Sequence, residues 1–137
     1  MISIRKINKK DIGLLKKEWK IEKPFIKRLE EQKSGKISFL ICFLNKKPIG
    51  HGKIIWFKTP VIEDMYVKKD FRMKGIGRNL LHRLERLART KSFRQVRLEI
   101  SKKNIRGLNF YKREKYFTKL DLKESFIMEK NCKKKTF

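Results

Sequence analysis

The stretch from residue 64 to residue 77 reads Asp64-Met65-Tyr66-Val67-Lys68-Lys69-Asp70-Phe71-Arg72-Met73-Lys74-Gly75-Ile76-Gly77. A short apolar strand ends at a charged turn, and the turn passes through two glycines into an amphipathic helix. The first N–H groups of a helix have no partner within the helix, and the aligned peptide dipoles favour an anion there. Because glycine has no Cβ, it lets a phosphate approach the main chain closely. The stretch therefore predicts a pyrophosphate-binding turn.

The chain has the size and composition of one globular domain. Its 137 residues, of which 39% are hydrophobic, suffice for a single packed core. The longest apolar run, Ile37 to Leu44, is far too short to cross a bilayer, and Met1 to Lys6 lacks the apolar core of a signal peptide. Cys42 and Cys132 form no metal-ligand pattern and are compatible with a reduced compartment. We therefore expect no metal, no membrane association and a cytoplasmic location.

The charge of the chain is unusually positive. Lys and Arg total 39 against 14 Asp and Glu, which is a formal net charge of +25. A field of this sign attracts polyanions such as RNA or a ribosome surface. The alternative is a Lys-rich sequence that places Lys wherever the surface is solvated. Charge bears on association and not on fold, so both interpretations stay open.

The order of apolar patterns predicts a mixed α/β domain with a central sheet. Strands are expected at Ile2–Ile4, Ile37–Leu44, Ile49–Phe57, Val61–Val67, Gln95–Ile100, Tyr116–Leu120 and Ser125–Glu129. Helices are expected after Asp11 as N-cap, from Pro24 to a C-terminal cap at Gly35, after the glycine turn, and after Asn104 as N-cap. On the helix after the turn, Glu85 and Arg89 are assigned to the polar face, where their spacing suits an ion pair.

Three features of the chain resemble the Gcn5-related N-acetyltransferase (GNAT) superfamily. Arg72 to Gly77 is similar to the family's Arg/Gln-x-x-Gly-x-Gly/Ala signature, and the strand Met65-Tyr66-Val67 lies at the expected distance before it. Leu98-Glu99-Ile100, Asn104 and Phe110-Tyr111 resemble the second signature. The hairpin around Asn45 to Gly50 is similar to the family's second and third strands.

The resemblance covers nearly the whole chain and implies the single-domain acyl-CoA N-acyltransferase fold. That fold is an α+β domain with a central mixed, mostly antiparallel sheet flanked by helices, here over residues 1–130 and followed by a basic tail, 131–137. The sequence departs from the family pattern at Lys115, where relatives commonly carry glycine before an aromatic residue.

The activity implied by the resemblance is direct transfer of an acetyl group from acetyl-CoA to a primary amine. Backbone groups of Met65 and Val67, on either side of Tyr66, would pair with the pantetheine arm. The pyrophosphate would be wrapped by Arg72, Met73, Lys74, Gly75, Ile76, Gly77 and Arg78. Lys74 and Arg78 would add charge, although both are also ordinary on a solvated helix start. Asn104 would contact the cofactor or only cap its helix.

Acetyl transfer needs two groups that handle protons. An alkylammonium must lose a proton before its nitrogen can attack, and the departing thiolate must be protonated or stabilised. The resemblance places the general acid at Tyr111, for which a packing aromatic is the alternative. Among bases, Glu99 ranks first, from similarity to bacterial ribosomal-protein alanine N-acetyltransferases, and Glu63 ranks second. Asp64, a water chain, or a purely structural Glu99 remain alternatives.

The acceptor is not identified by the sequence. A protein N-terminus or a lysine is compatible with the resemblance, and the net charge favours acidic peptides or ribosomal proteins over polyamines. The competing hypothesis is a protein that keeps the fold but binds RNA or ribosomes through its basic surface, with little or no catalysis. Both a monomer and a homodimer are compatible with the sequence.

Overall fold

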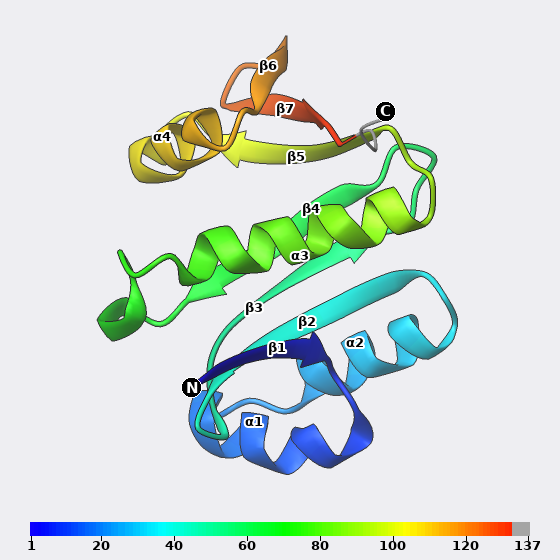
Figure 1. Cartoon of the computed structure of the whole chain (residues 1–137), viewed down its shortest axis with the longest axis vertical. Helices are drawn as coiled ribbons and strands as arrows, with labels where there is room; N and C mark the ends of the chain where they lie inside the picture. The colour runs from blue at the N-terminus through cyan, green and yellow to red at the C-terminus, as the bar shows by residue number, and fades with distance from the viewer. Residues whose placement is uncertain (133–137) are drawn as a thin grey trace.

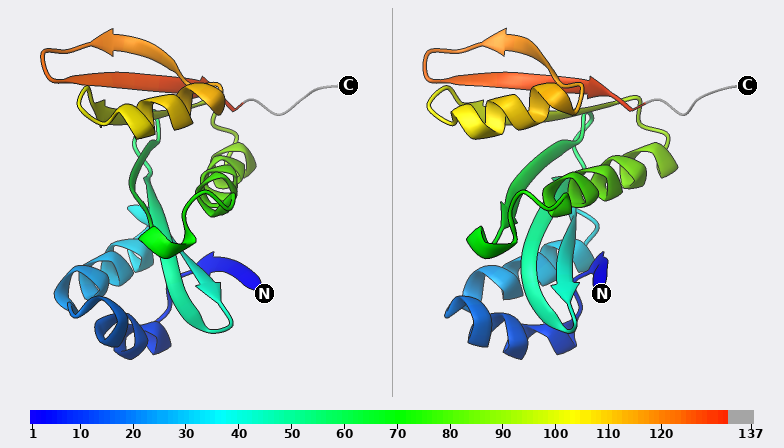
Figure 2. Two further views of the ribbon diagram at one scale, coloured as in Figure 1. Left: turned by 90° about the vertical axis from the view of Figure 1, so that its left-hand side faces the viewer. Right: turned by 60° about the vertical axis from the view of Figure 1, so that its left-hand side comes forward.

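The computed structural model describes residues 1–132 and consists of a seven-stranded sheet with helices on both faces (Figures 1 and 2). The strands are β1 (Ile2–Lys6), β2 (Ile37–Leu44), β3 (Lys47–Ile55), β4 (Val61–Val67), β5 (Gln95–Ser101), β6 (Phe117–Asp121) and β7 (Ser125–Asn131). The helices are α1 (Ile12–Trp19), α2 (Lys23–Lys33), α3 (Ile76–Thr90) and α4 (Ile105–Arg113). The strand order is β1-β2-β3-β4-β5-β7-β6, and every neighbouring pair is antiparallel except β4 and β5. The predicted fold class is confirmed.

Strand boundaries differ from the predicted ones by a few residues at most. β3 ends at Ile55 rather than Phe57, β6 starts one residue later than expected, and β7 continues to Asn131. Of the predicted basic tail, Asn131 therefore belongs to the sheet and Cys132 is buried, while 133–137 lie outside the described residues. None of the helices in residues 1–132 is long and apolar enough to span a membrane.

The continuous apolar run of β2 is explained by burial on both faces of the sheet. Its odd-numbered residues, from Ile37 to Phe43, pack in one core with Leu15 of α1 and Phe25 of α2. Leu40 and Cys42 point the other way, into the core beneath α3. Figure 2 shows α1 and α2 on one side of these strands and α3 on the other. A strand covered on both faces has no solvated side, so it needs no polar alternation.

The apolar face that the sequence predicts for α3, formed by Ile76, Leu80, Leu81, Leu84, Leu87 and Ala88, packs in the core, but the predicted place of Glu85 is wrong. Glu85 is 2% exposed, and its carboxylate accepts hydrogen bonds from the Tyr116 hydroxyl at 2.6 Å and from Lys130 Nζ at 3.0 Å. Position 85 is one helical turn beyond Leu81, so it falls within the buried stripe. Its partners come from the far end of the chain, which a local pattern does not reveal.

Replacing Tyr116 with phenylalanine should destabilise the protein by about 1–3 kcal/mol, because the buried Glu85 carboxylate loses a donor.

Burial and the Glu85 charge also raise the pKa of Tyr116. Above pH 10 the unfolded chain loses the tyrosine proton while the folded chain keeps it, so the wild type loses stability as pH rises. The variant has no such proton. The difference in urea unfolding free energy should therefore shrink above pH 10, by up to about 1.4 kcal/mol per pH unit. A constant difference would contradict this.

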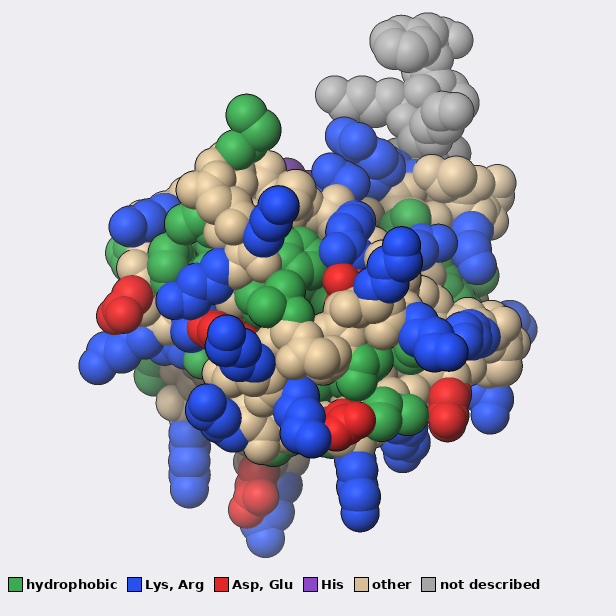
Figure 3. Space-filling model, turned by 90° about the horizontal axis from the view of Figure 1, so that it is seen from below, with side chains coloured by type: hydrophobic (Ala, Val, Ile, Leu, Met, Phe, Trp, Pro, Cys, Tyr) green, Lys and Arg blue, Asp and Glu red, His purple; other side chains and the backbone are tan. Residues whose placement is uncertain are grey.

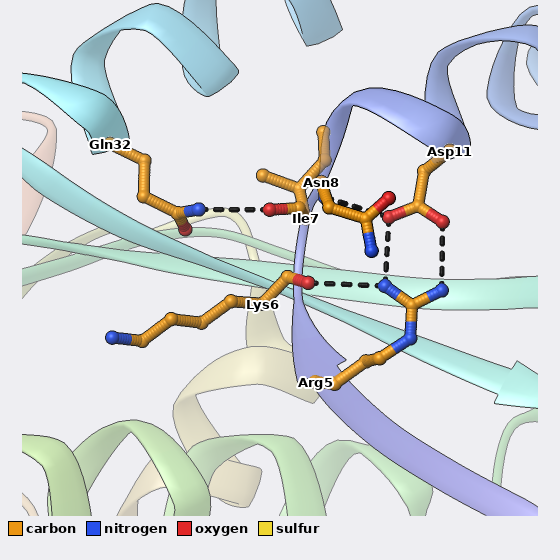
Figure 4. A network of polar contacts seen from close by, with 6 residues as sticks. All are labelled: Arg5, Lys6, Ile7, Asn8, Asp11 and Gln32. Carbon is orange, nitrogen blue, oxygen red and sulfur yellow. Dashed lines mark hydrogen bonds and ion pairs between the residues drawn. The ribbon is translucent and has the colours of Figure 1, made fainter.

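Asp11 does not cap α1 as the sequence predicts. Residues Lys9–Asp11 form a short 3-10 turn, so Asp11 already has helical backbone angles, φ −78° and ψ −22°, whereas a capping residue is extended. Its carboxylate instead accepts two hydrogen bonds from Arg5 and one from the Asn8 N–H, all at 2.8 Å (Figure 4). The carboxylate thus ties β1 to the chain that leads into α1.

Backbone conformations agree with the predicted turns. Asn45 and Lys46 both have positive φ, at 48° and 75°, as a tight two-residue hairpin between β2 and β3 requires. Gly35, with φ 83°, follows α2 as the expected C-terminal cap. Lys115, where the sequence departs from the family pattern, adopts φ 74°, in the left-handed region that favours glycine.

The two parallel strands β4 and β5 separate soon after they begin. Their register pairs Val61 with Arg97, whose N–H donates to the Pro60 carbonyl at 2.9 Å. β5 pairs along its whole length with β7 instead. Beyond Val61, residues of β4 and β5 line a cavity. Because the sheet opens there, the edge of β4 becomes accessible in the middle of the molecule.

Candidate active site

Two adjoining cavities meet where the sheet opens. The first, of about 790 Å³, lies between β4, β5 and the turn from β6 to β7. The second, of about 660 Å³, lies between β4, the start of α3, and α4. Met65, Asn104 and Tyr111 line both cavities, so these residues form the junction. We call the first the acceptor cavity and the second the cofactor groove.

The backbone of β4 presents an open edge to the cofactor groove. The Tyr66 carbonyl faces β3, since an ideal Cβ on Gly50 would lie 2.8 Å from its oxygen. Alternate residues of a strand direct their N–H and C=O to opposite edges, so Met65 and Val67 direct theirs away from β3. One group of this edge is already engaged, because the Val67 carbonyl accepts a hydrogen bond from Arg72 Nε at 2.7 Å. The remaining groups suit an extended ligand chain that adds to β4 like a further strand.

The glycine turn presents free N–H groups at the other end of the groove. Met73 and Gly75 have φ of 63° and 81°, and the Asn79 N–H donates to the Gly75 carbonyl at 3.0 Å. The N–H groups of the preceding residues, Ile76 to Arg78, therefore lie before the first bond of α3, where an anion is favoured. The groove is also lined by Arg72, Arg78, Arg106 and Arg113.

Most of the predicted cofactor residues come together in this groove. It is lined by Met65, Tyr66, Val67, Arg72, Met73, Gly75, Gly77, Arg78, Asn104 and Tyr111. Ile76 and Lys74 do not line it. The Ile76 side chain is buried in the core, and the Lys74 amine lies 5.9 Å from the centre of the Phe71 ring. Asn104 caps α4, because its Oδ1 accepts a hydrogen bond from the Gly107 N–H at 2.9 Å.

Tyr111 places a phenol at the junction of the two cavities. Its ring packs edge-to-face against Phe110 and Tyr116, with centroids 5.0 and 5.5 Å apart. Burial raises the pKa of Tyr111 to about 12, so the hydroxyl stays protonated at neutral pH. Within residues 1–132 this hydroxyl has no hydrogen-bond partner, which leaves it available to a ligand.

Both predicted bases line the acceptor cavity, on opposite walls. Glu63 comes from β4 and Glu99 from β5. Glu99 Oε2 accepts a hydrogen bond from the Ser125 hydroxyl at 2.6 Å, which orients that carboxylate. The alternative base, Asp64, is already engaged by Arg28 at 2.7 Å and Lys53 at 3.5 Å.

Asp64 is better explained as part of a structural cluster behind the cavity. Burial raises the pKa of its carboxyl, but the hydrogen bond and charge of Arg28 outweigh this and leave the pKa below its usual range. The Asp64 carbonyl lies 2.8 Å from Nδ1 of His51, whose ring packs among Trp19, Phe25, Phe39 and Tyr66. Burial lowers the pKa of His51 to about 4, so this imidazole is neutral at pH 7. In the described part of the chain, no group of His, Cys, Asp or Glu could hold a metal ion.

Sequence reasoning missed the contribution of the β6–β7 turn and the start of β7. Glu124 of the turn and Ser125, the first residue of β7, line the acceptor cavity, about 60 residues after β4 in the chain. No local pattern marks them, because neither belongs to a motif. Only the pairing of β7 with β5 brings the turn to the end of β5.

Comparisons with known proteins agree with this geometry. Residues 3–116 match the model of the acetyltransferase (GNAT) family. Streptothricin acetyltransferase A of Bacillus subtilis is 35% identical over 104 residues, which are 69% of this chain and 60% of that protein. The spermidine N(1)-acetyltransferase of Thermoplasma acidophilum is 28% identical over 118 residues, which are 85% of this chain and 73% of that protein. The chain thus spans about three fifths of the length of the first relative.

Solved structures share the fold over almost the whole chain. PaiA N-acetyltransferase from Thermoplasma acidophilum, in complex with coenzyme A, has a TM-score of 0.82 at 24% identity and covers 96% of this chain and 99% of its own. The ribosomal-protein-S18-alanine N-acetyltransferase from Escherichia coli has a TM-score of 0.79 at 16% identity, and the match covers 99% of this chain and 97% of that one. The family match covers most of the chain. The chain belongs to the acetyltransferase (GNAT) family.

Proposed function

We propose that this protein transfers an acetyl group from acetyl-CoA to a primary amine. The observation that carries the proposal is the junction at Tyr111, where an anion-binding groove meets a separate cavity lined by carboxylates. The amine nitrogen forms a bond to the thioester carbonyl carbon, the carbon–sulfur bond breaks, and CoA leaves as a thiol. Support comes from a structural neighbour solved with coenzyme A and from a relative named as a spermidine N(1)-acetyltransferase.

The cofactor groove suits both ends of coenzyme A. The free N–H groups after Gly75 suit the pyrophosphate. Arg78 lies in the same groove, where its charge is shared with Glu114, 3.3 Å away. The open edge of Met65 and Val67 suits the amides of the pantetheine arm. A thioester at the end of that arm would reach the junction, so the groove fixes where the acetyl group is presented.

Tyr111 acts on the leaving sulfur in this proposal. A thiol resembling that of cysteine has a pKa of about 8.5, so complete proton transfer from a phenol with a pKa of about 12 is uphill by about 5 kcal/mol. The phenol therefore acts first as a hydrogen-bond donor that stabilises the departing thiolate. The acceptor ammonium loses two protons on becoming the amide: one passes to the base and on to solvent, and the other supplies the neutral thiol.

Glu99 accepts the proton of the acceptor amine, and Glu63 is the second candidate. With Glu99→Gln we expect kcat/KM at pH 7 to fall by about 100-fold, and by less at pH 9 or above, where more of the amine is already neutral. Glu63→Gln is the matched control, since it removes the same charge from the opposite wall. Steady-state kinetics across pH distinguish the two. A larger loss in the Glu63 variant would reverse the assignment.

The proposed reaction is tested by its two products. Purified protein should release free CoA thiol from acetyl-CoA in the presence of primary amines, and mass spectrometry should find the acetylated amine. Protein with Gly75→Glu serves as the blank. Coenzyme A binding without thiol release, across a panel of small amines and peptides, would refute the transferase proposal.

A second candidate function is binding to RNA or ribosomes through the basic exterior. Figure 3 shows Lys and Arg side chains distributed over the whole of one face, among polar and hydrophobic groups, rather than gathered in one patch. A spread of this kind favours association with polyanions without a defined site. The test is RNA binding at increasing salt. An absence of salt-dependent binding in near-physiological buffer would remove this function.

A further inference from the structure

We propose that Arg28 is a positioning residue for acetyl transfer: through Asp64 it holds a bulge in β4 that directs the Met65 N–H to the junction of the two cavities. The inference rests on the proposed function, because it names what keeps that site in shape. Arg28 belongs to α2, and Asp64 lies 36 positions later in the chain. Only the fold brings these two residues together.

β4 carries one extra residue where it passes between the two cavities. The pairing of β3 with β4 is irregular between His51 and Lys53. Two residues of β4, Asp64 and Met65, there stand opposite the single residue Gly52. An ideal Cβ on Gly52 would lie 2.6 Å from the Met65 sulfur, so the glycine makes room for the bulge. A bulge bends its strand and changes the direction of the groups beside it.

Asp64 adopts a backbone conformation that needs support. Its φ is 56°, in the left-handed region that residues with a side chain rarely occupy. Its carboxylate accepts hydrogen bonds from Arg28 Nη2 at 2.7 Å and Nε at 3.2 Å, and Lys53 lies 3.5 Å away. Arg28 in turn lies over the rings of Phe25 and Phe39, 5.3 and 5.0 Å from their centres. The helix α2 therefore delivers a well-held guanidinium to the bulge.

The Asp64 carbonyl sets the direction of the next N–H. It accepts a hydrogen bond from Nδ1 of His51 at 2.8 Å, so it faces β3. Because the C=O and N–H of a planar trans peptide point in opposite directions, the Met65 N–H points away from β3. On that side β4 pairs with β5 only at Val61, and Met65 lines both cavities. The N–H is thus open to a ligand at the junction.

An N–H at this place serves the proposed reaction. Attack by the amine moves negative charge onto the thioester carbonyl oxygen, and a fixed backbone donor stabilises that charge. Removing such a donor costs about 100-fold or more in kcat, so misdirecting it should cost about tenfold. Arg28 lines neither cavity, so it acts on the reaction only through Asp64.

The test uses glycine to separate backbone conformation from charge. Glycine adopts a positive φ without a supporting side chain, whereas alanine does not. Arg28→Met and Asp64→Ala should each lower kcat about tenfold, whereas Asp64→Gly should stay near the wild type. The double variant, Arg28→Met with Asp64→Gly, should regain most of the kcat that Arg28→Met alone loses. Arg86→Met, which removes the same charge from an exposed position of α3, is the control.

A measurement that needs no turnover accompanies the kinetics. In isotope-labelled protein, the NMR amide resonance of Met65 should shift when acetyl-CoA is added without an acceptor amine. The shift should be retained in Asp64→Gly and be much smaller in Asp64→Ala. Urea unfolding identifies the variants that remain folded, and the double variant decides the question even where Asp64→Ala does not fold.

Equal kcat in folded Asp64→Ala and Asp64→Gly would overturn the inference, as would a double variant no faster than Arg28→Met. Either result leaves the transferase function standing. A protein that binds coenzyme A but acetylates no amine would instead refute the proposed function. In that case the Met65 resonance still reports whether the bulge directs this N–H to the ligand, and an unshifted resonance in the wild type contradicts it.

Discussion

Gly75→Glu should weaken coenzyme A binding by about 100-fold or more. Two effects combine. Gly75 has φ 81°, a conformation that costs a residue with a side chain about 1–2 kcal/mol, so the turn is expected to rearrange and redirect its N–H groups. The new carboxylate also stands beside the place of the pyrophosphate, where like charges at contact distance repel by several kcal/mol at an effective dielectric of about 20. Isothermal titration with coenzyme A measures the loss.

Gly13→Glu is the matched control for this variant. Gly13 is exposed on α1, an added Cβ would meet no atom within 4 Å, and its φ is not in the left-handed region. The substitution changes the net charge equally, so its coenzyme A affinity should stay near that of the wild type. Thermal unfolding shows whether either variant has lost its fold. Wild-type affinity in a folded Gly75→Glu protein would place the pyrophosphate elsewhere.

Tyr111→Phe should lower kcat by about 100-fold or more without changing the affinity for coenzyme A. The substitution removes only the hydroxyl, and no residue of the described chain depends on that group for a hydrogen bond. Stability should therefore change little. The pKa of Tyr111 is raised to about 12, so its ionisation should not appear in the wild-type kcat profile below pH 10. Steady-state kinetics, with binding measured separately, test the prediction.

Tyr116→Phe provides the comparison, because it removes a hydroxyl from the adjacent ring. That hydroxyl serves the buried Glu85 carboxylate, so its loss should lower stability and leave kcat nearly unchanged. The two variants should thus show opposite patterns. Equal losses of kcat in both would indicate that ring packing matters and that the Tyr111 hydroxyl has no chemical role.

Local patterns were sufficient for most of the elements and for the cofactor groove. The turn around Gly75 lies between a strand and a helix start and includes residues with positive φ, so the local sequence is sufficient to specify its backbone conformation. The same holds for Asn45 and Lys46, and for the apolar run of β2. Glu85 shows the limit. Its type suggested an exposed position, but the buried stripe of α3 and two distant partners stabilise it in the core.

The sequence by itself indicated the family, the fold and the groove that we propose for coenzyme A, because short-range backbone geometry builds the glycine turn. Only the tertiary structure decided the character of the acceptor cavity. Its walls come from β4, from β5 and from the β6–β7 turn: the separation of the parallel strands opens the cavity, and the pairing of β7 with β5 brings Glu124 to it. Net charge is a sum over the whole chain, so it carries no information on which side chains meet in a cavity.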